Sequence, residues 1–256
     1  MLKVATWNVN SLRVRLPQLR DWLALEQPDL LGLQETKVAD VDFPYADIES
    51  LGYVVTFAGQ KSYNGVAILS RQAATEVLVD IPGFTTPERR VLAATFGKVR
   101  MINLYVPNGS ELGSDKYDFK LRWLDALVSW LKNEVTTHEH VVVVGDFNIA
   151  PEERDVHDPD VWKDTVLFSA AVRALFQSLV DAGLCDTFRL HSQESGYYSW
   201  WDYRMAAFRR NLGLRIDHVL ASPALYKTCT ACRIDKAPRK WERPSDHAPV
   251  IAEFNI

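Results

Sequence analysis

The 256-residue chain has little of what marks secreted or membrane proteins. Its three cysteines are too few for a disulfide framework, and no apolar run approaches membrane-spanning length. Residues 2–10 mix polar and apolar side chains, so an ordinary signal peptide is not expected. We therefore expect a protein without a membrane segment in the reducing cytoplasm.

Two common catalytic signatures are also missing. No Gly-rich loop follows the first expected strand, which excludes a Rossmann or P-loop phosphate cradle. No serine has the context of a nucleophile elbow. Cys229 and Cys232 have the spacing of a zinc half-site, but no second Cys or His pair lies near them in the sequence. Two small buried residues in a strand are the preferred interpretation of this pair.

Charge is distributed unevenly along the chain. The formal net charge is −4, which gives no global attraction to nucleic acid. Residues 204–243, however, hold ten Lys or Arg against three acids, so this segment is basic and the remainder strongly acidic. An acidic body with a basic segment fits an anionic partner, although solvated charges on unrelated faces would give the same count.

Alternating apolar strands and amphipathic helices predict an α/β fold. Three helices are expected, from near Pro17 to before Pro28, over about 117–135, and along the apolar face that starts at Phe168 and stops at Gly183. We expect two mixed sheets packed face to face with helices outside each, in a single domain over residues 1–256. The expected strands are 2–9, 29–35, 53–58, 65–70, 91–96, 99–106, 141–144, 214–221, 228–234 and 248–254.

The stretch 141–151 is the most informative. Four consecutive valines indicate a strand buried on both faces, and Gly145 ends it. Asp146 and Asn148 follow at a spacing of two, which places both side chains on one side of an extended chain. Such a pair can orient water or approach a metal ion. Gly, Asp and Asn are also ordinary turn residues, so a simple turn is the alternative.

Similar polar residues end other strands. Glu35, Asp146, Asn148 and Asp246 are hard oxygen ligands of the kind that Mg²⁺ or Mn²⁺ prefers. Asp246 and His247 are adjacent and would point apart in an extended chain, so Asp217 is the candidate that orients the imidazole. Each has a simpler interpretation: Glu35 as a solvated strand end, Asp217 as a buried acid paired with an arginine, His247 as a structural histidine.

Seven motifs in order along nearly the whole chain resemble the exonuclease III family of abasic-site endonucleases, within the endonuclease/exonuclease/phosphatase superfamily. They are WNVNSLR at 7–13, LQETK at 33–37, NGVA at 64–67, YVPNG at 105–109, GDFNIAP at 145–151, LRIDH at 214–218 and PSDHAP at 244–249. The resemblance implies a four-layer α/β sandwich and Mg²⁺-dependent hydrolysis of DNA phosphodiesters, with Mn²⁺ as an alternative ion.

The resemblance also implies residue roles. The metal site would draw on Asn8, Glu35, Asp146, Asn148, Asp246 and His247. Asp146 would activate the attacking water and Asn148 would support it, while Asp246 would be either a second metal ligand or a hydrogen-bond partner. His247, oriented by Asp217, would contact the scissile phosphate. Tyr105 and Asn108 would line the phosphate site.

The expected partner is double-stranded DNA with abasic sites or damaged 3′ ends, bound by a monomer. The expected DNA contacts are Asn108, Trp200, Arg204, Arg209, Arg210 and Arg215, although Trp200 and Trp201 would serve equally well as core aromatics. Position 10 is Asn where some relatives have Asp, Leu214 stands where certain relatives place a Trp, and segment 151–167 matches no fixed motif.

Two other functions remain open from the sequence. One is a phosphodiesterase of the same superfamily that acts on RNA or a phospholipid. The other is a catalytically silent DNA-binding module, which should have lost one or more of the expected catalytic residues. None is missing. The balance between cleavage at abasic sites and removal of 3′ groups is also open.

Overall fold

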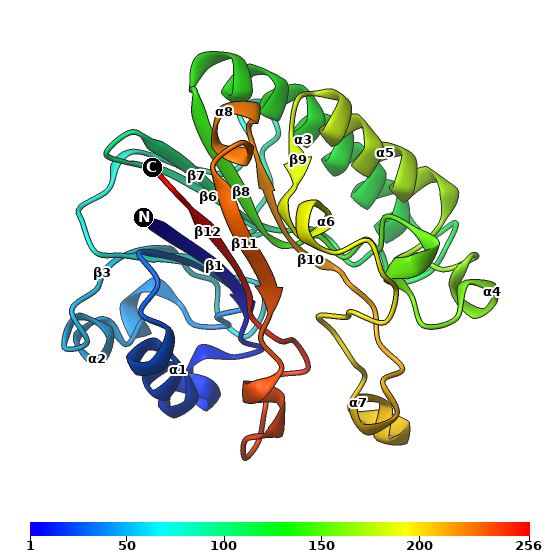
Figure 1. Cartoon of the computed structure of the whole chain (residues 1–256), viewed down its shortest axis with the longest axis horizontal. Coiled ribbons are helices and arrows are strands. Elements are labelled where there is room, and N and C mark those ends of the chain that lie inside the picture. Colours follow the sequence, from blue (N-terminus) through cyan, green and yellow to red (C-terminus); the bar gives the residue numbers. More distant parts are fainter.

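The computed structural model describes residues 1–256 and contains two six-stranded β-sheets (Figure 1). In order across the first sheet, the strands are β11 (Cys229–Ile234), β12 (Val250–Phe254), β1 (Leu2–Asn8), β2 (Leu30–Gln34), β4 (Val66–Ser70) and β3 (Val54–Ala58). Across the second they are β5 (Thr75–Val79), β6 (Val91–Phe96), β7 (Val99–Tyr105), β8 (His140–Asp146), β10 (Asp217–Ala221) and β9 (Cys185–Asp186).

Each sheet contains one parallel pair joined by a crossover helix. Helix α1 (Leu12–Glu26) joins β1 to β2, and α3 (Asp115–Thr137) joins β7 to β8. The other neighbouring strands are antiparallel. Because parallel strands end at the same edge, this connectivity brings the polar residues after β1 and β2 together, and likewise those after β7 and β8.

Helices cover the outer face of each sheet, which gives four layers (Figure 1). Helices α1 and α2 (Tyr45–Glu49) pack on the first sheet, while α3 and α5 (Ala170–Asp181) pack on the second. A third apolar core fills the space between the sheets. The predicted four-layer α/β sandwich is confirmed. Short helices in the connections are α4 (Pro159–Trp162), α6 (Thr187–His191), α7 (Ala207–Arg210) and α8 (Pro223–Tyr226), with 3₁₀ turns at Asp40–Asp42, Glu153–Asp155, Arg204–Ala206 and Ala237–Lys240.

Local sequence explains the two long helices of the second sheet. The Ser114 side chain caps α3 by accepting a hydrogen bond from the Tyr117 N–H. Helix α5 buries Val172, Phe176 and Leu179, which are spaced four and three residues apart and so lie on one face. These apolar faces hold both helices on the sheet that carries Asp146.

The start of the first helix was predicted wrongly. Helix α1 begins at Leu12, so Pro17 lies inside it rather than at its start. The N–H groups of Ser11 and Leu12 donate to the carbonyls of Glu35 and Thr36 at 2.8 and 3.0 Å. These contacts after β2 satisfy the first turn of the helix, and such a tertiary contact has no local sequence signal.

Two strands were not predicted. Strand β5 is an edge strand with four exposed residues, so it lacks the apolar alternation that marks a half-buried strand. Strand β9 has only two residues, Cys185 and Asp186. All ten expected strands are present: β6 has the expected bounds, and the other nine differ by one to three residues at an end. The helices are all too short or too polar for a membrane crossing.

Candidate active site

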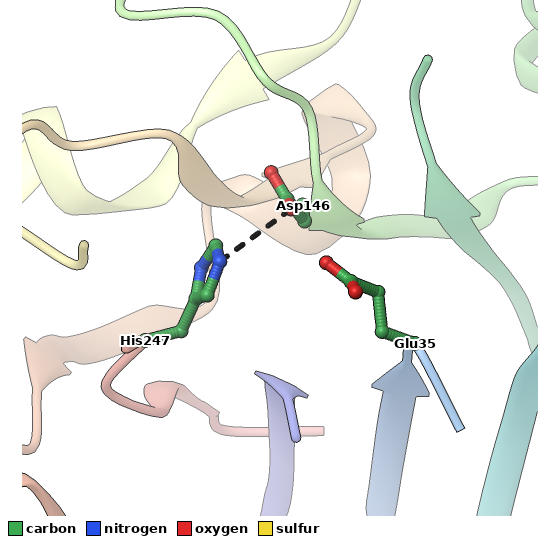
Figure 2. Close-up of side chains that lie close together, drawn as sticks. All are labelled: Glu35, Asp146 and His247. Atoms are coloured by element: carbon green, nitrogen blue, oxygen red, sulfur yellow. Dashed lines mark ion pairs between the residues drawn. The ribbon is translucent and has the colours of Figure 1, made fainter. Parts of the chain in front are cut away.

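Three ionisable side chains from different strand ends meet between the two sheets (Figure 2). Glu35 follows β2 and His247 precedes β12 in the first sheet, while Asp146 ends β8 in the second. One ligand atom from each lies within 4.8 Å of the others. The site therefore depends on how the two sheets pack against each other.

Asp146 is held by donors on both carboxylate oxygens. Its Oδ2 accepts a hydrogen bond from the Asn8 side-chain amide at 2.9 Å, and its Oδ1 accepts from the Asn148 backbone N–H at 2.9 Å. Asn148 has a left-handed φ of 49°, which closes a tight turn. Burial raises the pKa of Asp146 to about 7, although nearby His247 opposes this shift. The turn and the site are thus the same feature.

His247 lies between two carboxylates. Its Nδ1 is 2.9 Å from Asp217 Oδ2, and its Nε2 is 3.8 Å from Asp146 Oδ2. Burial disfavours the charged ring, but Asp217 and then Asp146 outweigh it and raise the pKa of His247 to about 10. The ring is therefore an imidazolium at neutral pH. Strand pairing places Asp217 directly opposite Asp146, which puts both acids beside the ring.

Glu35 is linked to Asp146 through Asn8. The Asn8 amide donates to Glu35 Oε1 at 2.8 Å as well as to Asp146, so it holds the two carboxylates together. Asn8 Oδ1 accepts the Asn10 backbone N–H at 2.9 Å, so Asn8 bonds the carboxylates through its amide nitrogen. Lys37 Nζ lies 2.8 Å from Glu35 Oε2.

The phosphate-site residues expected from the sequence lie beside this cluster. Asn148 Oδ1 accepts a hydrogen bond from the Asn108 amide at 3.2 Å, and Asn148 Nδ2 donates to the Val106 carbonyl at 2.9 Å. Tyr105 ends β7 opposite Asp146. Burial, with Glu35 and Asp146, raises the pKa of Tyr105 well above its ordinary value, so it keeps its phenolic O–H.

Asp246 is engaged on both oxygens by neighbours. Oδ1 accepts from the Asn10 amide at 2.9 Å and Oδ2 from the Trp200 indole N–H at 3.0 Å. Burial opposes ionisation, but His247 and these hydrogen bonds lower the pKa of Asp246. Asp246 thus accepts hydrogen bonds from two side chains, and its role as a second metal ligand stays a prediction. Trp200 is half-buried, whereas Trp201 is a core residue.

The expected DNA contact at Arg215 is wrong. Its side chain is 1% exposed, with Nε 2.6 Å from Asp155 Oδ1 and Nη2 2.8 Å from Asp186 Oδ2. A guanidinium enclosed by two carboxylates has no face left for a phosphate. The sequence could not show in which direction the Arg215 side chain points. Asp217 in turn pairs with His247 rather than with an arginine.

The other expected cations are on the surface. Arg204, Arg209 and Arg210 are exposed on and just before α7. Leu214 is fully buried and pairs through its backbone with Trp200, so it packs in the core. Cys229 and Cys232 are buried in β11, as expected for two small residues in a strand, and neither forms a disulfide.

Two residues of the site were missed in the sequence. Lys37 is the last residue of the LQETK motif, two residues after Glu35, but no role was assigned to it. Ser199 Oγ accepts the backbone N–H groups of Ile216 and Asp217 at 3.1 and 3.0 Å, which fixes the start of β10. Ser199 carried no signal, because its contact joins segments far apart in the chain.

Comparison with known proteins gives one consistent family. Residues 5–247 match the model of the Endonuclease/Exonuclease/phosphatase family. The chain is 39% identical to exodeoxyribonuclease III of Haemophilus influenzae, covering 99% of this chain and 100% of that protein.

Solved structures agree with this match. A 3′ phosphatase from Neisseria, NExo, bound as a variant to product DNA hairpin, is 46% identical with a TM-score of 0.98. An AP endonuclease from Archaeoglobus fulgidus is 41% identical with a TM-score of 0.96, and the alignments cover 100% of each chain in both cases. The chain therefore belongs to the endonuclease/exonuclease/phosphatase family, where its relatives are the exodeoxyribonuclease III and AP endonuclease nucleases.

Proposed function

We propose that this protein hydrolyses phosphate esters of duplex DNA on the 5′ side of abasic sites and at damaged 3′ ends. The observation that carries the proposal is the convergence of Glu35, Asp146 and His247, with Asp217 behind the imidazole. A module that only binds DNA has no need of three ionisable groups held together in a largely buried site.

The donor set fits a hard divalent cation, and we propose Mg²⁺, with Mn²⁺ as an alternative. Glu35 and Asp146 would hold it, since they supply carboxylate oxygens within 4.8 Å of each other and of His247. Burial raises the pKa of Asp146, and the carboxylates of Asp217 and Glu35 add to this shift, so a bound cation would favour the ionised carboxylate. When bound, the ion would neutralise phosphate charge and acidify water.

The residues of this chain would divide the remaining tasks. Asp146 is placed to accept a proton from the attacking water, and the Asn148 N–H and Asn8 amide fix its orientation. The His247 imidazolium would donate to a phosphate oxygen as charge develops on it, while Asp217 holds the ring. The Tyr105 O–H and the Asn108 amide would supply further donors to the phosphate.

DNA is favoured as the substrate over RNA or phospholipid. Arg204, Arg209 and Arg210 are exposed cations within ten residues of Trp200 in the sequence, and the Trp200 indole would form one wall of a sugar pocket. The Neisseria relative was solved with a product DNA hairpin. We propose that the chain acts as a monomer in the cytoplasm, where its three free cysteines would stay reduced.

The test uses matched duplexes that carry an internal abasic site, a 3′-phosphate or an ordinary 3′ end, with Mg²⁺ and with EDTA. We expect product on at least one damaged duplex with Mg²⁺ and none with EDTA. Asp118→Asn, an exposed acid on α3, is the matched control for a substitution at Asp146 and should keep full activity. Wild-type protein that leaves every damaged duplex intact, while cleaving RNA or a phospholipid, would overturn the assignment.

A further inference from the structure

Lys120 on α3 is fully buried, and its partners are peptide carbonyls rather than a carboxylate. Its Nζ donates to the carbonyl oxygens of Asn148 at 2.7 Å, Val166 at 2.8 Å and Asn108 at 3.1 Å. A buried lysine without a paired acid is uncommon, because burial of an ammonium is costly unless its N–H groups are all satisfied.

The three acceptors match the ammonium form. An ammonium has three N–H donors, whereas a neutral amine has two, so only the charged form satisfies all three carbonyls. Burial lowers the pKa of Lys120 to about 7, and Asp146 acts in the opposite direction. The three hydrogen bonds hold three separate peptide groups at fixed positions around Lys120 Nζ.

The three carbonyls belong to three loops around the site. Asn108 follows β7, Asn148 follows β8, and Val166 lies in the 151–167 segment. The side chains of Asn108 and Asn148 bond each other at 3.2 Å, and the Asn148 N–H bonds Asp146 at 2.9 Å. Lys120 Nζ therefore binds the backbone of Asn108 and of Asn148, whose side-chain amides belong to the phosphate site. Through the Asn148 backbone it is also linked to Asp146.

Gly109 shows how closely the first loop lies on this lysine. Its φ is +96°, and a Cβ at this position would lie 3.1 Å from Lys120 Cδ. The loop that carries Asn108 therefore rests directly on the lysine side chain. Its position depends on that side chain as well as on the hydrogen bond to Nζ.

Resting on the phosphoesterase function proposed above, we propose that Lys120 is a positioning residue for the reaction. It makes no contact with the Glu35–Asp146–His247 cluster and acts through the peptide groups of Asn108 and Asn148. A shift of about 1 Å in such groups can cost about a hundredfold in rate. The role predicts a loss in the chemical step rather than in DNA affinity.

The first test is Lys120→Met, which keeps the length of the side chain and removes the three hydrogen bonds. We expect the single-turnover rate with saturating enzyme to fall about a hundredfold, with the Kd for DNA changed by less than about threefold. Lys132→Met, at an exposed position of the same helix, is the matched control and should match wild type. An unchanged rate in Lys120→Met would overturn the proposal.

A double-mutant cycle separates positioning from general support of the fold. If Lys120 acts by positioning the side-chain amides of Asn108 and Asn148, Lys120→Met should cost less than about fivefold in an Asn108→Ala/Asn148→Ala background, because both amides are already gone. If its effect is on the whole domain, the two losses should multiply. Multiplied losses would exclude the positioning role.

A measurement on the DNA-free protein tests the role of Lys120 without relying on the proposed activity. The side-chain amide NMR signals of Asn108 and Asn148 should shift in Lys120→Met and stay in place in Lys132→Met. Unshifted signals would overturn the proposal. Wild-type protein without activity on any DNA would instead overturn the proposed function and leave the NMR result standing.

Lys120→Arg covers the case in which the methionine variant fails to fold. It retains a cation, but a planar guanidinium cannot direct three N–H bonds from one nitrogen. We expect about a tenfold slower single turnover and shifted Asn148 amide signals. A wild-type rate with unshifted signals in this variant would contradict the positioning role.

Discussion

Two groups of mostly buried charges differ in their balance of positive and negative charge. The acidic cluster consists of Glu35, Asp146, Asp217 and His247, three carboxylates and one imidazolium, with Lys37 paired to Glu35 at its edge. The balanced cluster consists of Asp155, Asp186, Arg189 and Arg215, in which two carboxylates pair with two guanidiniums. Arg215 and Asp217 are only two residues apart in the chain, yet they belong to different clusters.

The pKa values follow this difference in balance. In the acidic cluster, burial raises the pKa of Asp146 to about 7. In the balanced cluster, burial acts in the same direction on Asp155, but Arg215 and Arg189 outweigh it and lower the pKa. Burial alone therefore does not mark a reactive group. An excess of buried negative charge does mark one, because it leaves a carboxylate that can accept a proton or bind a cation.

The balanced cluster instead secures the backbone next to the site. The Arg215 N–H donates to the Asp155 carbonyl at 2.8 Å, and the Asp155 carboxylate accepts from the Glu152 N–H at 3.0 Å. These bonds attach the start of the 151–167 segment to the entry of β10. The balanced cluster therefore stabilises the fold, while the acidic cluster, with its excess negative charge, supplies the reactive groups.

The largest expected effect comes from neutralising the acidic cluster. We expect Asp146→Asn to lower the single-turnover rate by about 10⁴-fold, because the group that accepts the proton is lost while the shape is kept. DNA affinity should change little, since the residue is buried. Rapid-quench assays for the rate and fluorescence anisotropy for binding would measure both. A parallel loss of DNA binding would show that Asp146 is structural.

The next effect comes from breaking the balanced cluster. Arg215→Met leaves Asp186 without its guanidinium and Asp155 with Arg189 alone, so the unfolding free energy should fall by about 3–5 kcal/mol. Urea denaturation would measure it. The rate of the folded fraction should fall far less than in Asp146→Asn. A stability within about 1 kcal/mol of wild type would show that this cluster is not a structural anchor.

The sequence predicted the layers because apolar patterning is local. Buried residues were predicted from the valine run of β8 and from the amphipathic faces of α3 and α5, and the structure agrees. The errors are at places where partners are distant. Helix α1 begins at Leu12 because of carbonyls after β2, and β5 is an exposed edge whose sequence, TEVLV, does not alternate apolar and polar residues.

The candidate site was predicted in the same uneven way. Asp146, Glu35 and His247 lie at strand ends, and the family resemblance assigned them to one site that the fold brings together. The orientation of a long side chain was not available from the sequence, so Arg215 was assigned to DNA although it points into the interior. Lys120 had no signal at all, because its partners are backbone atoms of three distant loops.

A smaller effect should appear in the pH dependence of stability. The folded pKa of Asp146 lies near 7, above its ordinary value, and that of His247 lies near 10. Groups with raised folded pKa values stabilise the fold fully at low pH and lose this contribution as pH rises through the folded value. In EDTA, wild-type stability should therefore fall between about pH 4 and pH 10.

Asp146→Asn tests this reasoning directly. It removes the lower part of that window, so its stability relative to wild type should improve by about 2–3 kcal/mol between pH 5 and pH 8. The balanced cluster behaves in the opposite sense, because the lowered pKa of Asp155 gives stability that is lost only as pH falls below about 4. Urea curves at both pH values, with Asp118→Asn as control, would show it. An equally steep fall in stability with pH in the variant and the wild type would contradict a raised pKa at Asp146.

The smallest effect should come from a charge that belongs to neither cluster. The Arg204 side chain is 88% exposed, and its nearest acid is Asp202 at 3.6 Å. A solvated cation of this kind contributes through counterion release, so Arg204→Ala should weaken DNA binding a few-fold and reduce the salt slope by about one. The single-turnover rate should be unchanged, because the residue lies outside the buried site. Anisotropy titrations at several salt concentrations would measure the slope. A large loss of rate with an unchanged salt slope would show that Arg204 acts in catalysis. Catalysis would then not depend only on the excess negative charge of the buried cluster.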